Sequence, residues 1–254
     1  MVIKKISRIP FKLKRIWMNR YILFLGGRIP QNFSDLRIRL LMLTFRKLYQ
    51  PIPFPEFSEI TPRTSRTSNV SEERWKLIRA CLPDNLRDLR FLDLGAWIGY
   101  FSIQCVKEGA YAVAVEMDGR KVQLLKLVKK RYGLDTLKAI KANLADFSLL
   151  STGPVDYVFY LNIHQHIYKK GPVGAERILA EIGQICRKGI FFESRPVNFE
   201  PSVASSNSEC SKLFNSVEGI LTLVKDRTGF HQVKELKYND GNDNPYRLFY
   251  LTKN

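Results

Sequence analysis

The residues with the clearest chemical meaning follow two apolar runs in the middle of the chain. Asp93, Gly95 and Gly99 are spaced as Asp-x-Gly-x-x-x-Gly after the first run, and Glu116 closes the second. A glycine turn lets the backbone approach a ligand closely, and an acid at the end of the next strand is the usual partner that holds an adenosine ribose. Trp97 stands where the dinucleotide pattern Gly-x-Gly-x-x-Gly has its middle glycine, which argues against an NAD-binding fold. The pattern therefore predicts a nucleoside-binding turn of another type.

A second set of side chains that could take part in acid–base chemistry follows the apolar run 155–161. Two of the chain's three histidines, His164 and His166, lie here together with Tyr168. A histidine with an ordinary pKa of ~6.5 suits removal of a hydroxyl proton near neutral pH. We take His166 as the candidate base, with His164 or Tyr168 as alternatives. The competing interpretation is that these side chains only hydrogen-bond and shape the loop. A metal site would need carboxylates close by, so none is predicted.

Alternating strands and helices would position both sets at one edge of a sheet. The order predicts an α/β, Rossmann-like, doubly wound and mostly parallel seven-stranded sheet with a C-terminal antiparallel hairpin. The predicted strands are 90–94, 111–116, 137–142, 155–161, 188–193, 230–237 and 246–252. The predicted helices are 99–108, 119–132, 174–186 and 208–225, with an earlier helix over 71–81.

The run from Asp93 to Ser102, with Glu116, resembles motif I of the class I S-adenosylmethionine (SAM)-dependent methyltransferases. Within that superfamily it looks like the FkbM-type sugar O-methyltransferases, whose lysine-and-acid motif on the fourth strand is missing here. The resemblance covers residues 88–254 and implies SAM as the cofactor. It implies that Asp93 orders the loop and the amino end of the cofactor, and that Glu116 accepts both ribose hydroxyls. The other cofactor-binding residues it implies are Gly95, Ala96, Trp97, Gly99, Met117, Asn143, Leu144 and Asn162.

The family's adenine loop matches the stretch after the third strand. Asn143 takes the leading place that is normally Asp, and Asp146 follows, so either side chain is a candidate for the exocyclic amine. Phe147 or Met117 would lie against the adenine ring. Both residue types are more often plain core.

On the acceptor side, the loop from Asn162 to Ile167 resembles the family pattern Asn-x-x-His-His-Leu. His166 matches its second His, and Gln165 replaces the first. Glu193 and Arg195 end the fifth strand, where they either contact the acceptor or pair with each other. This side looks like methyltransferases that act on glycans or their phosphate ends. The implied function is O-methylation of a sugar, lipid-linked or phosphorylated acceptor.

The chain carries a net charge of +17 at pH 7, and the basicity is concentrated at the N-terminus. Residues 1–50 hold twelve Lys or Arg against a single acid, Asp35. We therefore divide the chain into a basic amphipathic helical extension (1–55), a linker and leading helix (56–87) and the methyltransferase domain (88–254). The extension is interpreted first as an anchor on an anionic membrane surface, with Trp17 and Phe45 at the acyl boundary. Packing on the catalytic domain is the second interpretation, and binding to nucleic acid is the third.

Two alternatives to this function stay open. The first is an RNA methyltransferase, although the Asn/Asp-Pro-Pro-Tyr and catalytic-cysteine motifs of the base-methylating enzymes are absent. The second is a non-catalytic binding protein of methyltransferase fold, because the Trp97 side chain would narrow the cofactor cleft. Four widely spaced cysteines fit a reducing compartment, and no apolar run reaches the ~20 residues of a membrane span. The expected location is cytoplasmic and peripheral to the membrane.

Overall fold

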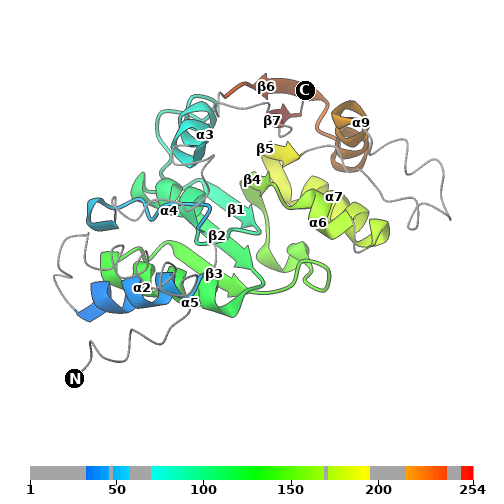
Figure 1. The fold of residues 1–254 in the computed structure, drawn as a ribbon. Coiled ribbons are helices and arrows are strands. Elements are labelled where there is room, and N and C mark those ends of the chain that lie inside the picture. The colour runs from blue at the N-terminus through cyan, green and yellow to red at the C-terminus, as the bar shows by residue number, and fades with distance from the viewer. Residues whose placement is uncertain are drawn as a thin grey trace.

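In the computed structural model, the described residues are 33–45, 48–57, 70–168, 171–194, 216–238 and 247–253. They form one seven-stranded sheet with helices on both faces (Figure 1). The strands are β1 (Arg90–Leu94), β2 (Tyr111–Glu116), β3 (Leu137–Lys141), β4 (Val155–Leu161), β5 (Cys186–Ser194), β6 (Gln232–Leu236) and β7 (Arg247–Thr252). Their order across the sheet is β3-β2-β1-β4-β5-β7-β6.

The sheet is parallel except at β7, which pairs antiparallel with both β5 and β6. The predicted Rossmann-like sheet with a closing antiparallel hairpin is thus confirmed. The chain runs outward from β1 through β2 to β3, and then returns to place β4 on the other side of β1. In open α/β sheets, ligands bind outside the carboxyl ends of the strands at such a reversal. The glycine turn and the histidines both follow strands that flank it.

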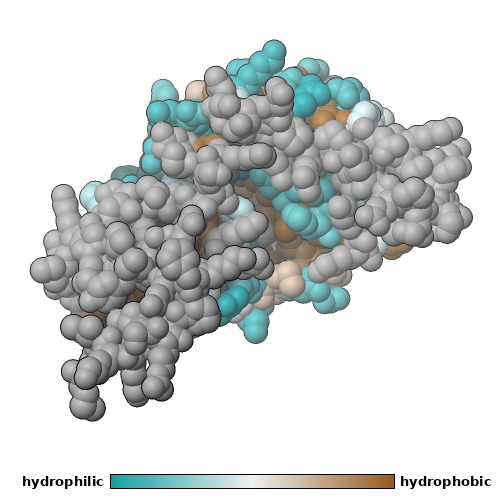
Figure 2. Space-filling model, in the orientation of Figure 1, coloured by the Kyte–Doolittle hydropathy of each residue, from teal (hydrophilic) through white to brown (hydrophobic). Residues whose placement is uncertain are grey.

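Helices on the two faces bury two hydrophobic clusters. On one face lie α4 (Tyr100–Lys107) and α5 (Gly119–Tyr132), which pack on β1, β2 and β3. On the other side of the sheet α7 (Pro172–Ile185) packs against α9 (Val217–Thr228) (Figure 1). Figure 2 shows hydrophobic residues in a central recess of the viewed face, where Figure 1 places the strand ends.

The described part of the N-terminal region packs on the sheet domain. Helix α2 (Phe33–Leu43) contacts α5, and the buried Asp35 carboxylate pairs with Arg131 at 2.8 Å. Phe45, which we expected at a membrane, is only 3% exposed and belongs to the core. This segment therefore follows the packing interpretation, because its apolar side chains remove more surface from water against α5 than they would alone. The basic residues before 33, including Trp17, lie outside the described residues.

Several element boundaries differ from the predictions. Helix α3 (Val70–Arg79) ends two residues early, and the proline-rich stretch that follows α2 contains a short turn, η2 (Pro55–Phe57). Helix α9 starts at Val217 rather than 208, because the Ser216 side chain accepts the Gly219 N–H at 3.0 Å and caps the helix there. The histidine segment is a short helix, α6 (His164–Tyr168), where we expected a loop.

Candidate active site

The turn after β1 contains three residues with positive φ angles, a backbone conformation that residues other than glycine rarely adopt. Gly95, Trp97 and Gly99 have φ angles of +69°, +57° and +79°. The N–H groups of Gly95 and Ala96 donate to the Val115 carbonyl at 2.9 and 3.0 Å, which ties the turn to the end of β2. A non-glycine residue in the left-handed region costs about 1–3 kcal/mol, so the strain at Trp97 must be offset by its surroundings.

The Glu116 carboxylate supplies part of that compensation. It lies at the carboxyl end of β2 and is only 7% exposed. Its Oε2 accepts the Trp97 N–H at 3.0 Å, and its Oε1 accepts the Asp118 N–H at 2.9 Å, with the Lys121 Nζ at 3.4 Å. A carboxylate has about four acceptor positions, so Oε2 keeps capacity for a further donor. Glu116 thus stands beside the glycine turn as an oriented acceptor for hydroxyl groups.

The Trp97 indole points to the N-terminal segment and α5. The Lys121 ammonium lies 3.7 Å from the ring centroid, and the Tyr49 ring meets it edge-on at 5.0 Å. Nearby, Gln50 accepts the Tyr100 N–H at the start of α4, at 3.3 Å. Sequence reasoning missed Tyr49, Gln50 and Lys121 as neighbours of the turn, because two of them come from a segment about fifty residues away and no local spacing marks them.

Asp93 faces α4. It is 4% exposed and accepts the Ser102 hydroxyl at 2.7 Å. Burial raises the pKa of the Asp93 carboxyl to about 6, partly opposed by the Ser102 hydrogen bonds. Its position fits the predicted role in ordering the loop.

The predicted adenine loop is closed by its own hydrogen bonds. Asn143 donates to Asp146 Oδ2 at 2.8 Å and accepts the Ala145 N–H at 3.2 Å, so the two candidate side chains are joined to each other. Leu144 is 6% exposed and belongs to the core, whereas Met117 is 55% exposed at the end of β2. Of the two residues proposed to contact the adenine ring, Phe147 packs on the core cluster, whereas Met117 is exposed.

The residue that precedes α6 contacts the glycine turn directly. A Cβ placed on Gly95 would lie 3.0 Å from the Ile163 side chain, which leads into α6. Asn162, at the end of β4, has φ +56°, and its N–H donates to the Glu193 carbonyl at 2.9 Å. Its buried Oδ1 atom has no hydrogen-bond partner among the described residues. A buried acceptor without a partner is costly, which makes this atom a candidate ligand contact.

The three catalytic candidates differ sharply in exposure. His164 is fully buried, with its Nδ1 3.2 Å from the Tyr160 hydroxyl, and burial lowers its pKa to about 4. Tyr168 is 4% exposed. His166 alone of the three is exposed. Of the three candidates, His166 alone is open to solvent, whereas His164 has the placement of a neutral core histidine.

Among the described residues, Glu193 has Arg74 as its ion-pair partner. Its fully buried carboxylate binds Arg74 of α3 at 2.6 Å and the Tyr238 hydroxyl at 2.7 Å. Burial of the end of β5 under α3 makes Arg74 its partner, while Arg195 lies outside the described residues. No group of three or more His, Cys, Asp or Glu side chains in the described ranges is arranged to hold a metal ion.

Known proteins resemble this chain in part of its sequence and in its fold. No family model matches the chain. A magnesium-protoporphyrin O-methyltransferase from Rhodobacter capsulatus is 28% identical over 116 residues, which are 45% of this chain and 49% of that protein. The match therefore spans about half of that relative's length.

Solved structures resemble the chain over most of its length. The N-terminal domain of EvdMO1 with SAH (S-adenosylhomocysteine) bound has a TM-score of 0.58 at 11% identity, covering 90% of this chain and 98% of that one. The magnesium protoporphyrin IX methyltransferase ChlM from Synechocystis PCC 6803, with bound SAM, has a TM-score of 0.50 at 14% identity, covering 93% and 91%. The bifunctional kinase-methyltransferase WbdD has a TM-score of 0.58 at 13% identity, covering 85% of this chain and 46% of that one.

Sheet order and element arrangement together define a Rossmann-like α/β fold. The solved structures narrow it to the fold of the class I SAM-dependent methyltransferases, as the sequence predicted.

Proposed function

We propose that the protein is a SAM-dependent methyltransferase that transfers the methyl group to an oxygen atom. The observation that carries the proposal is the Glu116 carboxylate, fixed by the N–H groups of Trp97 and Asp118 at the carboxyl edge of the sheet. An acceptor in this place suits the two hydroxyls of an adenosine ribose. Met117, Asn143, Leu144 and Asn162 complete the proposed cofactor site.

The cofactor step is tested by calorimetric titration of the full chain with SAM and with SAH. We expect binding by the wild type and its loss in Glu116→Ala. Glu108→Ala is the matched control, because Glu108 is also a glutamate but lies at the C-terminal end of α4, away from the glycine turn, and pairs with Arg79. A folded wild-type protein that binds neither compound would overturn the proposal in favour of a non-catalytic binding protein.

The chemical step is an in-line displacement at the sulfonium methyl, so alignment of acceptor and cofactor contributes most of the rate. We assign His166 as the base that takes the acceptor's proton, because it is exposed on α6, which follows β4, while His164 and Tyr168 are buried. General-base catalysis contributes about 10²–10⁴-fold. His166→Ala should lose turnover on that scale while SAM binding stays unchanged. If turnover persists within tenfold, the acceptor is aligned without a base.

For the acceptor we propose a sugar, lipid-linked or phosphorylated hydroxyl compound, from the resemblance of the α6 segment to methyltransferases that act on glycans or phosphate ends. A porphyrin carboxylate is a second candidate, since the curated relative is a magnesium-protoporphyrin O-methyltransferase. An RNA ribose hydroxyl is the third. A screen with radiolabelled SAM, run in parallel on glycolipid precursors, magnesium-protoporphyrin and RNA, separates the three by which product carries the label.

Association with an anionic membrane surface stays a proposal for the basic residues of the N-terminal region. No helix in the described ranges has the length and apolarity needed to cross a bilayer. Co-sedimentation of the full chain with anionic vesicles, at low and high salt, tests the proposal. Sedimentation that is lost in high salt supports it, and an unbound protein at low salt contradicts it.

A further inference from the structure

The sheet has a second concave region, far from the glycine turn. The chain between β3 and β4 contains only a short turn, η3 (Leu149–Thr152), so among the described residues no helix covers the outer strands on the face opposite α4 and α5. A hollow of about 770 Å³ remains over the first residues of β1, β2 and β3. Its volume falls within the range of about 300–1,000 Å³ that is typical of small-molecule sites.

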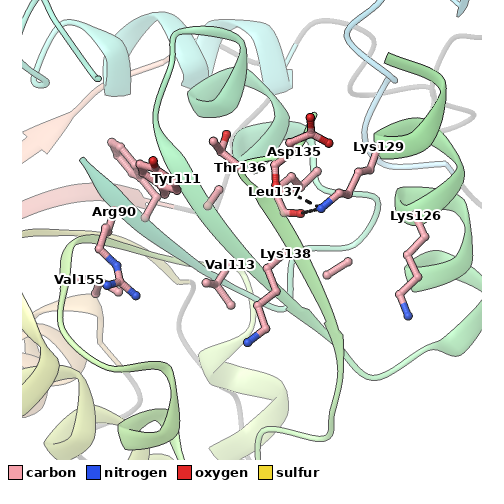
Figure 3. Close-up of a pocket in the computed structure, with 13 residues that line it drawn as sticks. Arg90, Tyr111, Val113, Lys126, Lys129, Asp135, Thr136, Leu137, Lys138 and Val155 are labelled. Carbon is pink, nitrogen blue, oxygen red and sulfur yellow. Dashed lines mark hydrogen bonds between the residues drawn. The ribbon is translucent and has the colours of Figure 1, made fainter. Parts of the chain in front are cut away.

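The lining of this hollow is strongly basic. Arg90, Lys126, Lys129 and Lys138 line it, against a single acid, Asp135. In Figure 3, Arg90 and Lys138 extend from the strands, whereas Lys126 and Lys129 extend from α5 beside the edge strand β3.

None of the four cations has a carboxylate partner within the described ranges. Lys129 donates to the carbonyls of Asp135 and Leu137, at 3.2 and 2.7 Å, and Arg90 donates to the Thr152 carbonyl at 3.4 Å. Lys126 and Lys138 are exposed and form no ion pair with other described residues. Elsewhere on the surface, basic side chains do pair, as Arg227 does with Glu176 at 2.6 Å. Positive charges that converge on a concave surface raise the local concentration of anions.

The hollow also offers an aromatic surface. Tyr111, the first residue of β2, is 48% exposed and lines the wall between Arg90 and β3. A half-exposed tyrosine ring offers a flat face for packing against a sugar or a base. Cations around an aromatic wall fit an organic phosphate better than they fit a bare inorganic ion.

We propose that this hollow binds a small organic phosphate carrying at least two negative charges. The site is separate from the methyl-transfer site, because Tyr111 begins β2 and Glu116 ends it. Five residue steps along a strand separate them by about 17 Å. A flat membrane surface fits a concave site poorly, so we assign a free ligand. The proposal goes beyond the proposed function and does not depend on it.

The test is calorimetric titration of the full chain at 0.15 M salt with pyrophosphate, and with ADP in the presence of saturating SAH. The informative variant is Lys126→Gln/Lys138→Gln. Its control, Lys76→Gln/Lys130→Gln, makes the same change in net charge at exposed positions outside the hollow. We expect the hollow variant to bind both pyrophosphate and ADP at least tenfold more weakly and the control variant to bind each within twofold of the wild type.

Three results would overturn the proposal. They are no binding of either probe by the wild type, equal losses in both variants, and Lys126/Lys138-dependent binding to anionic phospholipid vesicles without binding of free pyrophosphate. The pyrophosphate titration needs no SAM site, so its outcome is independent of whether the proposed function holds.

Discussion

The backbone N–H of Trp97 donates to the Glu116 carboxylate at 3.0 Å, across the gap between the glycine turn and the end of β2. Because the donor is a main-chain group, this hydrogen bond depends on the turn's conformation and not on the indole. The indole instead packs under Lys121 and beside Tyr49. The backbone of Trp97 therefore orients Glu116, whereas its side chain packs between α5 and the N-terminal segment.

This separation predicts the behaviour of Trp97→Ala. Loss of the half-buried ring should lower the free energy of unfolding by about 2–3 kcal/mol, less than for a fully buried tryptophan. SAM binding should persist within tenfold, because the N–H donor to Glu116 remains. Urea denaturation and calorimetry measure the two quantities, with Trp97→Phe as the milder control. Abolished binding in a folded Trp97→Ala protein would show that the indole forms a wall of the cofactor cleft.

Gly95 is constrained twice, by φ of +69° and by the Ile163 side chain 3.0 Å from where its Cβ would lie. Gly95→Ala should therefore weaken SAM binding and destabilise the fold by more than about 1 kcal/mol. Adding Ile163→Ala relieves the steric contact and leaves the backbone strain. The double variant should thus recover part of the lost binding. No recovery would mean that strain alone sets the requirement for glycine.

Two buried groups predict opposite pH dependences of stability. The pKa of His164 is lowered from 6.5 to about 4, so between these values the unfolded chain binds more protons and stability falls as pH falls. The pKa of Asp93 is raised from 3.8 to about 6, so the folded chain binds more protons there and stability falls as pH rises. Across its whole pH range, each shift changes the free energy of unfolding by about 3 kcal/mol, and the two changes have opposite signs.

Removing one of the two groups by substitution should reveal the pH dependence of stability that the other group causes. In His164→Phe, stability should decrease from pH 4 to pH 6, and in Asp93→Asn it should increase from pH 4 to pH 6.5. Urea denaturation at half-unit pH steps measures both. Parallel pH profiles for the two variants would contradict the assignment.

The Arg74–Glu193 pair predicts a strong energetic coupling. Arg74→Met or Glu193→Gln alone leaves a buried charged group without its partner, which costs about 3–5 kcal/mol. The double variant should be less destabilised than the sum of the two, with a coupling of about 1–3 kcal/mol. A double-mutant cycle by chemical denaturation gives the coupling. Additive effects would mean that water screens the pair and that the carboxylate is open to an acceptor.

Features that depend on short spacings along the chain can be predicted from the amino-acid sequence. Asp93, Gly95 and Gly99 lie within seven residues, and Glu116 follows at the end of the next strand. The turn, the strands and the fold class were therefore predictable, since alternation of apolar runs and helices leaves few topologies.

Which of the nearby side chains are buried and which are open to a ligand depends on the packed fold. His164 and His166 are two residues apart, yet the short helix α6 buries the first beside Tyr160 and exposes the second. Glu193 meets Arg74 across 119 positions, and Trp97 meets Tyr49 across 48, contacts for which no local pattern exists. Burial and partner choice depend on which surfaces the packed helices cover, and that is a property of the assembled sheet.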